Sequence, residues 1–185
     1  MTQQFSLLVK PVSGLCNIDC GYCFYRRALD LYPADRYTRR MNLTTAENMV
    51  RGFLGQRLPF SAICFQGGEP LLMGLDFYRS FVELEKRHGV NGQQVGNSFQ
   101  TNGLLINDEW ASFFKQYDML IGISLDGGRD VHDQYRIDGA GSGTFDRVMA
   151  ATNILRRGGV DFNILSMITH ISRADLKARA CLSNV

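Results

Sequence analysis

The chain has 185 residues, 45% apolar and 21% charged, a composition typical of a globular protein and not of a disordered, collagenous or coiled-coil one. Its length predicts one domain or a little more, and 20 basic against 18 acidic residues give no support for nucleic-acid or anionic-membrane binding. Its longest apolar runs are too short to span a bilayer and no signal peptide is visible, so we expect no membrane association and a cytoplasmic location.

Short apolar runs alternate with amphipathic segments along the chain. The apolar runs, bounded by Gly, Pro, Asn or Asp, predict buried strands at residues 5–10, 61–66, 95–100, 119–125 and 161–168. Helical spacing of apolar residues predicts helices at 45–55, 75–88, 107–116 and 144–157. This alternation is typical of βαβ units around a parallel sheet, in which functional groups gather at the C-terminal ends of the strands.

Local signals refine these elements. Thr44 or Thr45 is expected to cap the helix at 45–55, and Gly158-Gly159 to end the helix at 144–157. The polar, Gly-rich segment 130–143 predicts a long loop after the fourth strand. Residues 172–185 are expected to begin a fifth helix, capped by Ser172.

A cysteine cluster follows the first strand. Cys16, Cys20 and Cys23 lie in the sequence CNIDCGYC, and such crowding in a reducing compartment indicates metal or redox chemistry more than disulfides. Three thiolates can hold three irons of a cubane cluster and leave the fourth iron open. A zinc site of three thiolates and one His is an alternative, although the nearest candidate, His88, lacks ligand-like spacing. Three unrelated buried cysteines are the remaining interpretation.

A second motif, QGGEPLL at residues 66–72, follows the second predicted strand. Gly67-Gly68 and Pro70 suit a tight turn, which is sufficient to explain them structurally. The same small residues also let backbone groups approach the amino group of a bound amino acid. The motif therefore has a structural and a functional interpretation, and by itself it favours neither.

Together these motifs resemble the radical S-adenosylmethionine (SAM) superfamily, whose cluster loop has the same Cys-x3-Cys-x2-Cys spacing with an aromatic residue before the third Cys. The segments KPVSGLCNIDCGYCFY, FQGGEPLLMGLDFY, NSFQTNGLLIND and GISLDGGRDVHDQYR, followed by GTFDRV and FNIL, resemble anaerobic sulfatase-maturating enzymes in order and spacing. Those enzymes convert a Cys or Ser of a sulfatase into Cα-formylglycine. The resemblance runs from about residue 7 to about residue 170.

The resemblance implies a [4Fe–4S] cluster and SAM as cofactors, with SAM cleaved to methionine and a 5′-deoxyadenosyl radical that abstracts hydrogen from substrate. It implies a sulfatase polypeptide as substrate and an electron donor such as flavodoxin or ferredoxin. The family pattern places the cluster on Cys16, Cys20 and Cys23, and SAM against Tyr22, Gly68, Ser124 and Arg136. The residue types agree, since an Arg fork can pair with the SAM carboxylate. Other candidates for lining the substrate channel are Tyr25, Gln66, Gln100, Asn102 and Asp126.

The implied fold is α/β, a partial parallel (β/α) barrel of the radical SAM type that stops after about five strands. Residues 1–185 would form an incomplete core domain without the family's C-terminal domain for two further clusters, because only Cys64 and Cys181 remain. Cys64 is expected to be a small buried apolar residue in its strand. The family's catalytic Asp base also has no counterpart, so no catalytic residue is assigned, and we expect a truncated product or fragment.

Three functions stay open at this point. The first is a sulfatase-maturating enzyme or its radical-generating core, and the second is another radical SAM enzyme that modifies a different peptide or protein. The third is an inactive fragment or non-catalytic module in which an iron–sulfur cluster or a zinc ion is structural. Metal identity separates the third from the first two.

Overall fold

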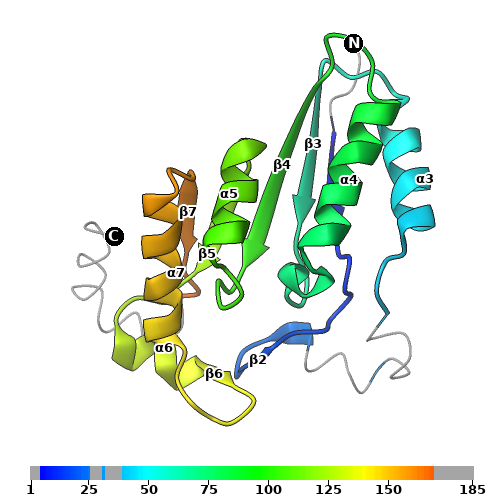
Figure 1. Ribbon diagram of the computed structural model, residues 1–185. Helices are drawn as coiled ribbons and strands as arrows, with labels where there is room; N and C mark the ends of the chain where they lie inside the picture. The colour runs from blue at the N-terminus through cyan, green and yellow to red at the C-terminus, as the bar shows by residue number, and fades with distance from the viewer. Residues whose placement is uncertain (1–4, 26–30, 32–38, 169–185) are drawn as a thin grey trace.

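The computed structural model describes residues 5–25, 31 and 39–168, and these residues form a parallel sheet with helices against it (Figure 1). The five sheet strands are β1 (Ser6–Val9), β3 (Phe60–Phe65), β4 (Gln94–Thr101), β5 (Leu120–Ser124) and β7 (Phe162–Leu165). They stand in the order β1-β3-β4-β5-β7, and each neighbouring pair is parallel. All five predicted strands are confirmed. The sheet is not closed among the described residues, as expected of a partial barrel.

Four helices cover one face of this sheet (Figure 1). They are α3 (Leu43–Leu54), α4 (Leu75–His88), α5 (Asp108–Gln116) and α7 (Phe145–Arg157). All four were predicted, and Gly158 ends α7 as expected. The predicted cap of α3 was wrong, because Asn42 precedes the helix and its side chain accepts the N–H of Thr45 at 2.8 Å. Thr44 and Thr45 lie inside the first turn instead.

The segment predicted as a loop at 130–143 contains two elements. Helix α6 (Arg129–Tyr135) leads directly into strand β6 (Arg136–Asp138). This strand pairs antiparallel with β2 (Ile18–Cys20), a strand that the sequence did not reveal. Both elements are too short for a periodic pattern, and α6 buries only Val131 and His132. The two-stranded ribbon lies below the C-terminal ends of β3 and β4 in Figure 1.

The core lies between the sheet and the helices and is rich in aromatic rings. Phe65 on β3 and Phe99 on β4 are neighbours in the sheet register, with ring centroids 4.9 Å apart. Tyr78 of α4 packs 4.8 Å from Phe99 and donates its hydroxyl to the Pro70 carbonyl at 2.7 Å. Pro70 begins a short 3-10 helix, η2 (Pro70–Met73), which the GGEP motif introduces. The core thus reaches the turn that carries this motif.

The opposite side of the sheet, which we call the open face, carries the alternate side chains of each strand. Leu8 and Leu165 are 61% and 46% exposed there, in contrast to the buried Ile63 and Ile123 on the helix side. Cys64 belongs to the open face and is only half-buried, so the prediction of a buried Cys64 was wrong. In the described part of the chain, no helix is both long and apolar enough to cross a membrane. Ser172, Cys181 and the predicted fifth helix at 172–185 lie outside the described residues.

Candidate functional site

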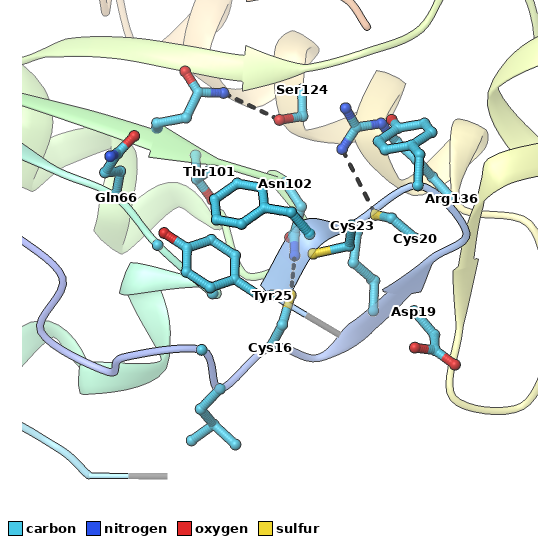
Figure 2. A pocket seen from close by; sticks show the side chains of 18 of the residues that line it. Cys16, Asp19, Cys20, Cys23, Tyr25, Gln66, Thr101, Asn102, Ser124 and Arg136 are labelled. Atoms are coloured by element: carbon cyan, nitrogen blue, oxygen red, sulfur yellow. Dashed lines mark hydrogen bonds between the residues drawn. The ribbon is translucent and has the colours of Figure 1, made fainter. Parts of the chain in front are cut away.

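A cavity of about 660 Å³ opens where the strands end, and Figure 2 shows residues from distant parts of the sequence around it. The loop after β1 contributes one wall, and the residues that end or follow β3, β4 and β5 contribute the others. Parallel strands bring their C-terminal ends to the same edge, which explains this convergence. The seven residues predicted to hold the cofactors all line the cavity: Cys16, Cys20, Tyr22, Cys23, Gly68, Ser124 and Arg136. Their contacts with a cofactor stay a prediction.

The three cysteines are held by the ribbon of β2 and β6. Cys20 is the last residue of β2, stands opposite Arg136 in the register and is 8% exposed. The chain then turns, and the N–H of Cys23 donates to the carbonyl of Cys20 at 3.0 Å. The N–H of Gly21 donates to the carbonyl of Tyr135 at 2.9 Å, which fixes the turn to the end of α6. All three thiols are free.

Burial disfavours the thiolate form of Cys16 and Cys20 in the protein alone. Burial raises the pKa of Cys16 to about 11. Burial also raises the pKa of Cys20, although the nearby Arg136 charge opposes the shift. A metal centre binds cysteines as thiolates, so its assembly here would release protons.

The arrangement fits an iron–sulfur cluster with one open iron. Among the described residues, no three His, Cys, Asp or Glu side chains are placed to hold a single metal ion. A cubane cluster makes a different demand, because each of three thiolates binds its own iron. Three free thiols facing a cavity of this size, with polar groups on the other walls, leave room for a ligand on the fourth iron.

The GGEP turn is bonded to the cysteine loop. Gly68 has φ of +39°, and a Cβ placed there would lie 2.1 Å from the carbonyl oxygen of Leu15. The next residue, Glu69, donates its N–H to that same oxygen at 2.8 Å. Only glycine permits this approach, so Gly68 keeps the backbone of the turn beside the residue that precedes Cys16.

Glu69 is fully buried and its carboxylate faces the protein, not the cavity. It accepts the N–H of Leu71 at 2.9 Å, the hydroxyl of Thr101 at 2.8 Å and the N–H of Asn102 at 2.8 Å. Burial raises the pKa of Glu69 to about 7, while the three donors lower it. The carboxylate thereby ties the turn after β3 to the end of β4.

A buried ion pair stands beside Cys20. Arg136 donates through Nε and Nη2 to the two carboxylate oxygens of Asp126, at 2.8 and 3.2 Å, and through Nη1 to the Cys20 sulfur at 3.9 Å. Tyr22 donates its hydroxyl to Asp126, and its ring lies 5.4 Å from the guanidinium. Although burial pushes the pKa of Asp126 upward, the hydrogen bonds and charge of Arg136 hold it below its usual value. Asp126 does not line the cavity, which corrects its predicted place in a channel.

The wall formed by β4 and β5 carries polar side chains, and one of them lies flat against the backbone of the sheet. Gln100 donates to the Ser124 hydroxyl at 3.1 Å across the two strands. A Cβ on Gly122 would lie 2.4 Å from Oε1 of Gln100, so the absence of a side chain there lets Gln100 lie against the sheet. Gln66, Gln100, Asn102 and Tyr25 line the cavity as predicted. The sequence analysis did not single out Thr101 or Met167, which also line the cavity. Thr101 lies within the quoted segment NSFQTNGLLIND, whereas no motif marks Met167.

Three comparisons relate the chain to known proteins. A family described as the radical SAM superfamily matches residues 11–179. The chain is 39% identical to a cysteine-type anaerobic sulfatase-maturating enzyme of Clostridium novyi (strain NT), over 90% of this chain and 44% of the relative. It is 34% identical to a serine-type anaerobic sulfatase-maturating enzyme of Bacteroides thetaiotaomicron, over 88% of this chain and 39% of the relative. The chain therefore spans less than half the length of these curated relatives.

Solved structures agree in fold. The structure described as native anSMEcpe with bound AdoMet and Cp18Cys peptide superposes with a TM-score of 0.87 at 35% identity, over 95% of this chain and 46% of that one. A structure of HydG, a maturase of the [FeFe]-hydrogenase, superposes with a TM-score of 0.61 at 12% identity, which indicates shared fold alone.

Proposed function

The chain belongs to the radical SAM superfamily, and we propose that it is the radical-generating core of an anaerobic sulfatase-maturating enzyme. The superfamily implies a [4Fe–4S] cluster and SAM. The observation that carries the proposal is the convergence of seven residues with suitable chemistry on one cavity, in a chain 34–39% identical to sulfatase-maturating enzymes. The residues from 1 to 185 would act as one core domain.

When bound, the cluster supplies one electron that cleaves SAM to methionine and a 5′-deoxyadenosyl radical, which abstracts hydrogen from a substrate. Cys16, Cys20 and Cys23 would hold three irons as thiolates. The backbone at Gly68 would meet the amino group of SAM, because no side chain blocks it there. This division would leave the fourth iron for the amino acid part of SAM.

The charged and polar side chains would orient SAM. Arg136 is fixed by Asp126 through two hydrogen bonds, which leaves Nη1 directed to the cluster side for the SAM carboxylate. Ser124 and Tyr22 would contact the nucleoside, since both line the cavity. Gln100 and Gln66 also line the cavity and would offer hydrogen bonds to the substrate.

The substrate would be a sulfatase segment that carries the target Cys or Ser. A solved neighbour is described with a bound Cp18Cys peptide, which supports a peptide as the class of substrate. Conversion of Ser to formylglycine removes two electrons and two protons in total, and conversion of Cys does the same while taking up water and releasing sulfide. One electron and one proton leave together as the abstracted hydrogen atom, so an exit for the second electron and an acceptor for the second proton are required. A small electron-transfer protein such as flavodoxin or ferredoxin would deliver the electron that reduces the cluster before SAM is cleaved.

The test is anaerobic incubation of the reconstituted full chain with SAM, a reductant and sulfatase peptides that carry Cys, Ser or Ala at the target position. We expect hydrogen abstraction from the target residue: a peptide deuterated at Cβ of the Cys or Ser should transfer deuterium to 5′-deoxyadenosine, detected by mass spectrometry, and the corresponding Ala peptide should not. Cleavage of SAM without this transfer would favour an enzyme for a different peptide. Uptake of zinc with no cluster would contradict the proposal and favour a non-catalytic module.

A further inference from the structure

Two side chains outside the cysteine motif donate hydrogen bonds to its sulfurs. Arg136 reaches Cys20, and Nδ2 of Asn102 lies 3.7 Å from the sulfur of Cys16 (Figure 2). Asn102 follows directly after β4 and is separated from Cys16 by 86 positions in the sequence. The fold therefore brings an amide donor to a cluster ligand from a different wall of the cavity.

The orientation of the Asn102 amide is fixed by its own contacts. Its Oδ1 accepts the N–H of Leu104 at 3.0 Å, so Nδ2 must be the atom that faces Cys16. One amide hydrogen serves Oδ1 of Asn17 at 2.8 Å, and the second is available for the sulfur. The Asn102 backbone is held as well, because its N–H donates to the buried Glu69 at 2.8 Å. Asn102 is 6% exposed, so water competes little for these bonds.

We propose that Asn102 tunes the cluster held by Cys16, Cys20 and Cys23, by donating an N–H···S hydrogen bond to the Cys16 thiolate that raises the reduction potential. Hydrogen bonds to the sulfurs are among the protein's means of setting such potentials. The reduced cluster carries one more negative charge than the oxidised one, so a donor stabilises the reduced form more. Asn102 acts on the cluster through the sulfur of Cys16. It is therefore a positioning residue, which affects the transfer of an electron to the cluster without binding iron itself. This inference rests on the proposed function in one respect, the presence of the cluster.

The buried carboxylate of the GGEP motif holds this donor in place. Glu69 holds Thr101 and Asn102 while its own N–H is bonded to Leu15, the residue before Cys16. The same side chain thereby fixes the donor relative to the loop that carries the acceptor. A shift of the GGEP turn would change the Asn102–Cys16 distance as well as the contact with SAM.

Two substitutions separate the hydrogen bond from the space that Asn102 fills. Asn102→Asp keeps an oxygen for the Leu104 N–H, replaces the donor with an acceptor and adds a negative charge. Asn102→Leu removes the donor without adding charge. The matched control is Asn97→Leu, which removes a buried amide on β4, the strand that precedes Asn102. The Asn97 amide donates to Glu85 at 3.1 and 2.9 Å, on the helix side and away from the cavity.

The experiment is a redox titration of the reconstituted full chain without SAM, monitored by EPR of the reduced cluster. We expect Asn102→Leu to disfavour reduction by about tenfold, equivalent to about 59 mV for a one-electron couple, and Asn102→Asp to do so by more. Asn97→Leu should leave the potential at the wild-type value. An unchanged or raised potential in both Asn102 variants would overturn the inference. Variants that bind no cluster would overturn it too, since Asn102 would then serve assembly and not the potential.

The outcomes distinguish this inference from the proposed function. A wild-type cluster with the expected shifts, but no cleavage of SAM, would retain the role of Asn102 and reject the enzyme. Cleavage of SAM with no shift in the Asn102 variants would reject the inference alone. A wild-type chain that binds only zinc would reject both.

Discussion

The two faces of the parallel sheet differ sharply although their side chains alternate along the same strands. On the helix side, Phe65, Phe99 and Ile121 are at most 2% exposed and pack against helix residues. The residues next to these three in the sequence point to the open face and are polar or small: Cys64, Gln100 and Gly122. The apolar Leu8 and Leu165 of the open face are half exposed. The helix side stabilises the fold by burying apolar area, whereas Gln100 and Ser124 of the open face line the cavity.

Phe99 and Gln100 are adjacent in β4 but point to opposite faces of the sheet, so their substitution should give the largest difference between the two faces. Phe99 packs within 5.2 Å of the rings of Phe65, Tyr78 and Phe114. Phe99→Ala should therefore lower the free energy of unfolding by about 3–5 kcal/mol, because it removes a large ring from a closed core. Urea denaturation measures the loss. The control Gln100→Ala removes one hydrogen bond on the other face and should cost about 1 kcal/mol. Equal losses for the two variants would contradict the division of the sheet into two faces.

A buried carboxylate on the helix side should oppose stability at high pH. Burial raises the pKa of Glu85 from 4.5 to about 7, so its protonated form stabilises the fold below pH 4.5, and this contribution is lost as pH rises through 7. Glu85→Gln removes this titrating group. The free energy of unfolding of the variant minus that of wild type should therefore be about 3 kcal/mol larger at pH 8 than at pH 4.5. Urea titrations of both proteins at the two pH values measure this, and a difference that does not change with pH would contradict it.

The GGEP turn should tolerate no added atom on the side of the cysteine loop. In Gly68→Ala, the new Cβ meets the Leu15 carbonyl, and φ of +39° adds strain. We expect SAM affinity to fall more than tenfold, or by more than about 1.4 kcal/mol, measured by calorimetry on the reconstituted protein. Gly74→Ala is the control, because Gly74 also has positive φ but no atom lies within 4 Å of the added Cβ. A Gly68→Ala protein that binds SAM as wild type does would show that the close approach is not required.

The smallest expected effect concerns a helix end far from the cavity. Asn42→Ala removes the side-chain acceptor of the Thr45 N–H and should lower the free energy of unfolding by about 1 kcal/mol. Asn48→Ala, on an exposed position of the same helix, should change it by less than about 0.5 kcal/mol. Thermal unfolding compares the two. Neither variant should alter the cluster content, and a loss of cluster in Asn42→Ala would mean that α3 supports the site.

The sequence predicted the elements that pack on the helix side, because their apolar residues repeat with the period of a strand or a helix. It missed β2, α6 and β6, which are three to seven residues long. The two short strands exist through their pairing with each other, and that long-range contact leaves no periodic pattern. The cap of α3 was wrong for a related reason. Asn42, Thr44 and Thr45 can all cap a helix, and only the position where the helix begins decides between them.

The cysteines of the site were found from their spacing, whereas Ser124 and Arg136 were found only through family resemblance. The contacts that organise the site were not predictable from either. Asp126 was expected in a channel but pairs with Arg136 and Tyr22 inside the protein. Cys64 was expected in the core, yet the alternation along β3 turns it to the open face. Such contacts depend on which face and register each strand adopts.

The most direct test of the account is formation of 5′-deoxyadenosine. The full chain would be reconstituted anaerobically with iron and sulfide, reduced in the presence of SAM, and compared with the variant Cys16→Ala/Cys20→Ala/Cys23→Ala. The account predicts 5′-deoxyadenosine and methionine from the wild-type chain and neither from the triple variant, with both proteins folded by circular dichroism. A wild-type chain that binds the cluster and SAM but forms no 5′-deoxyadenosine would contradict its assignment as a radical-generating core.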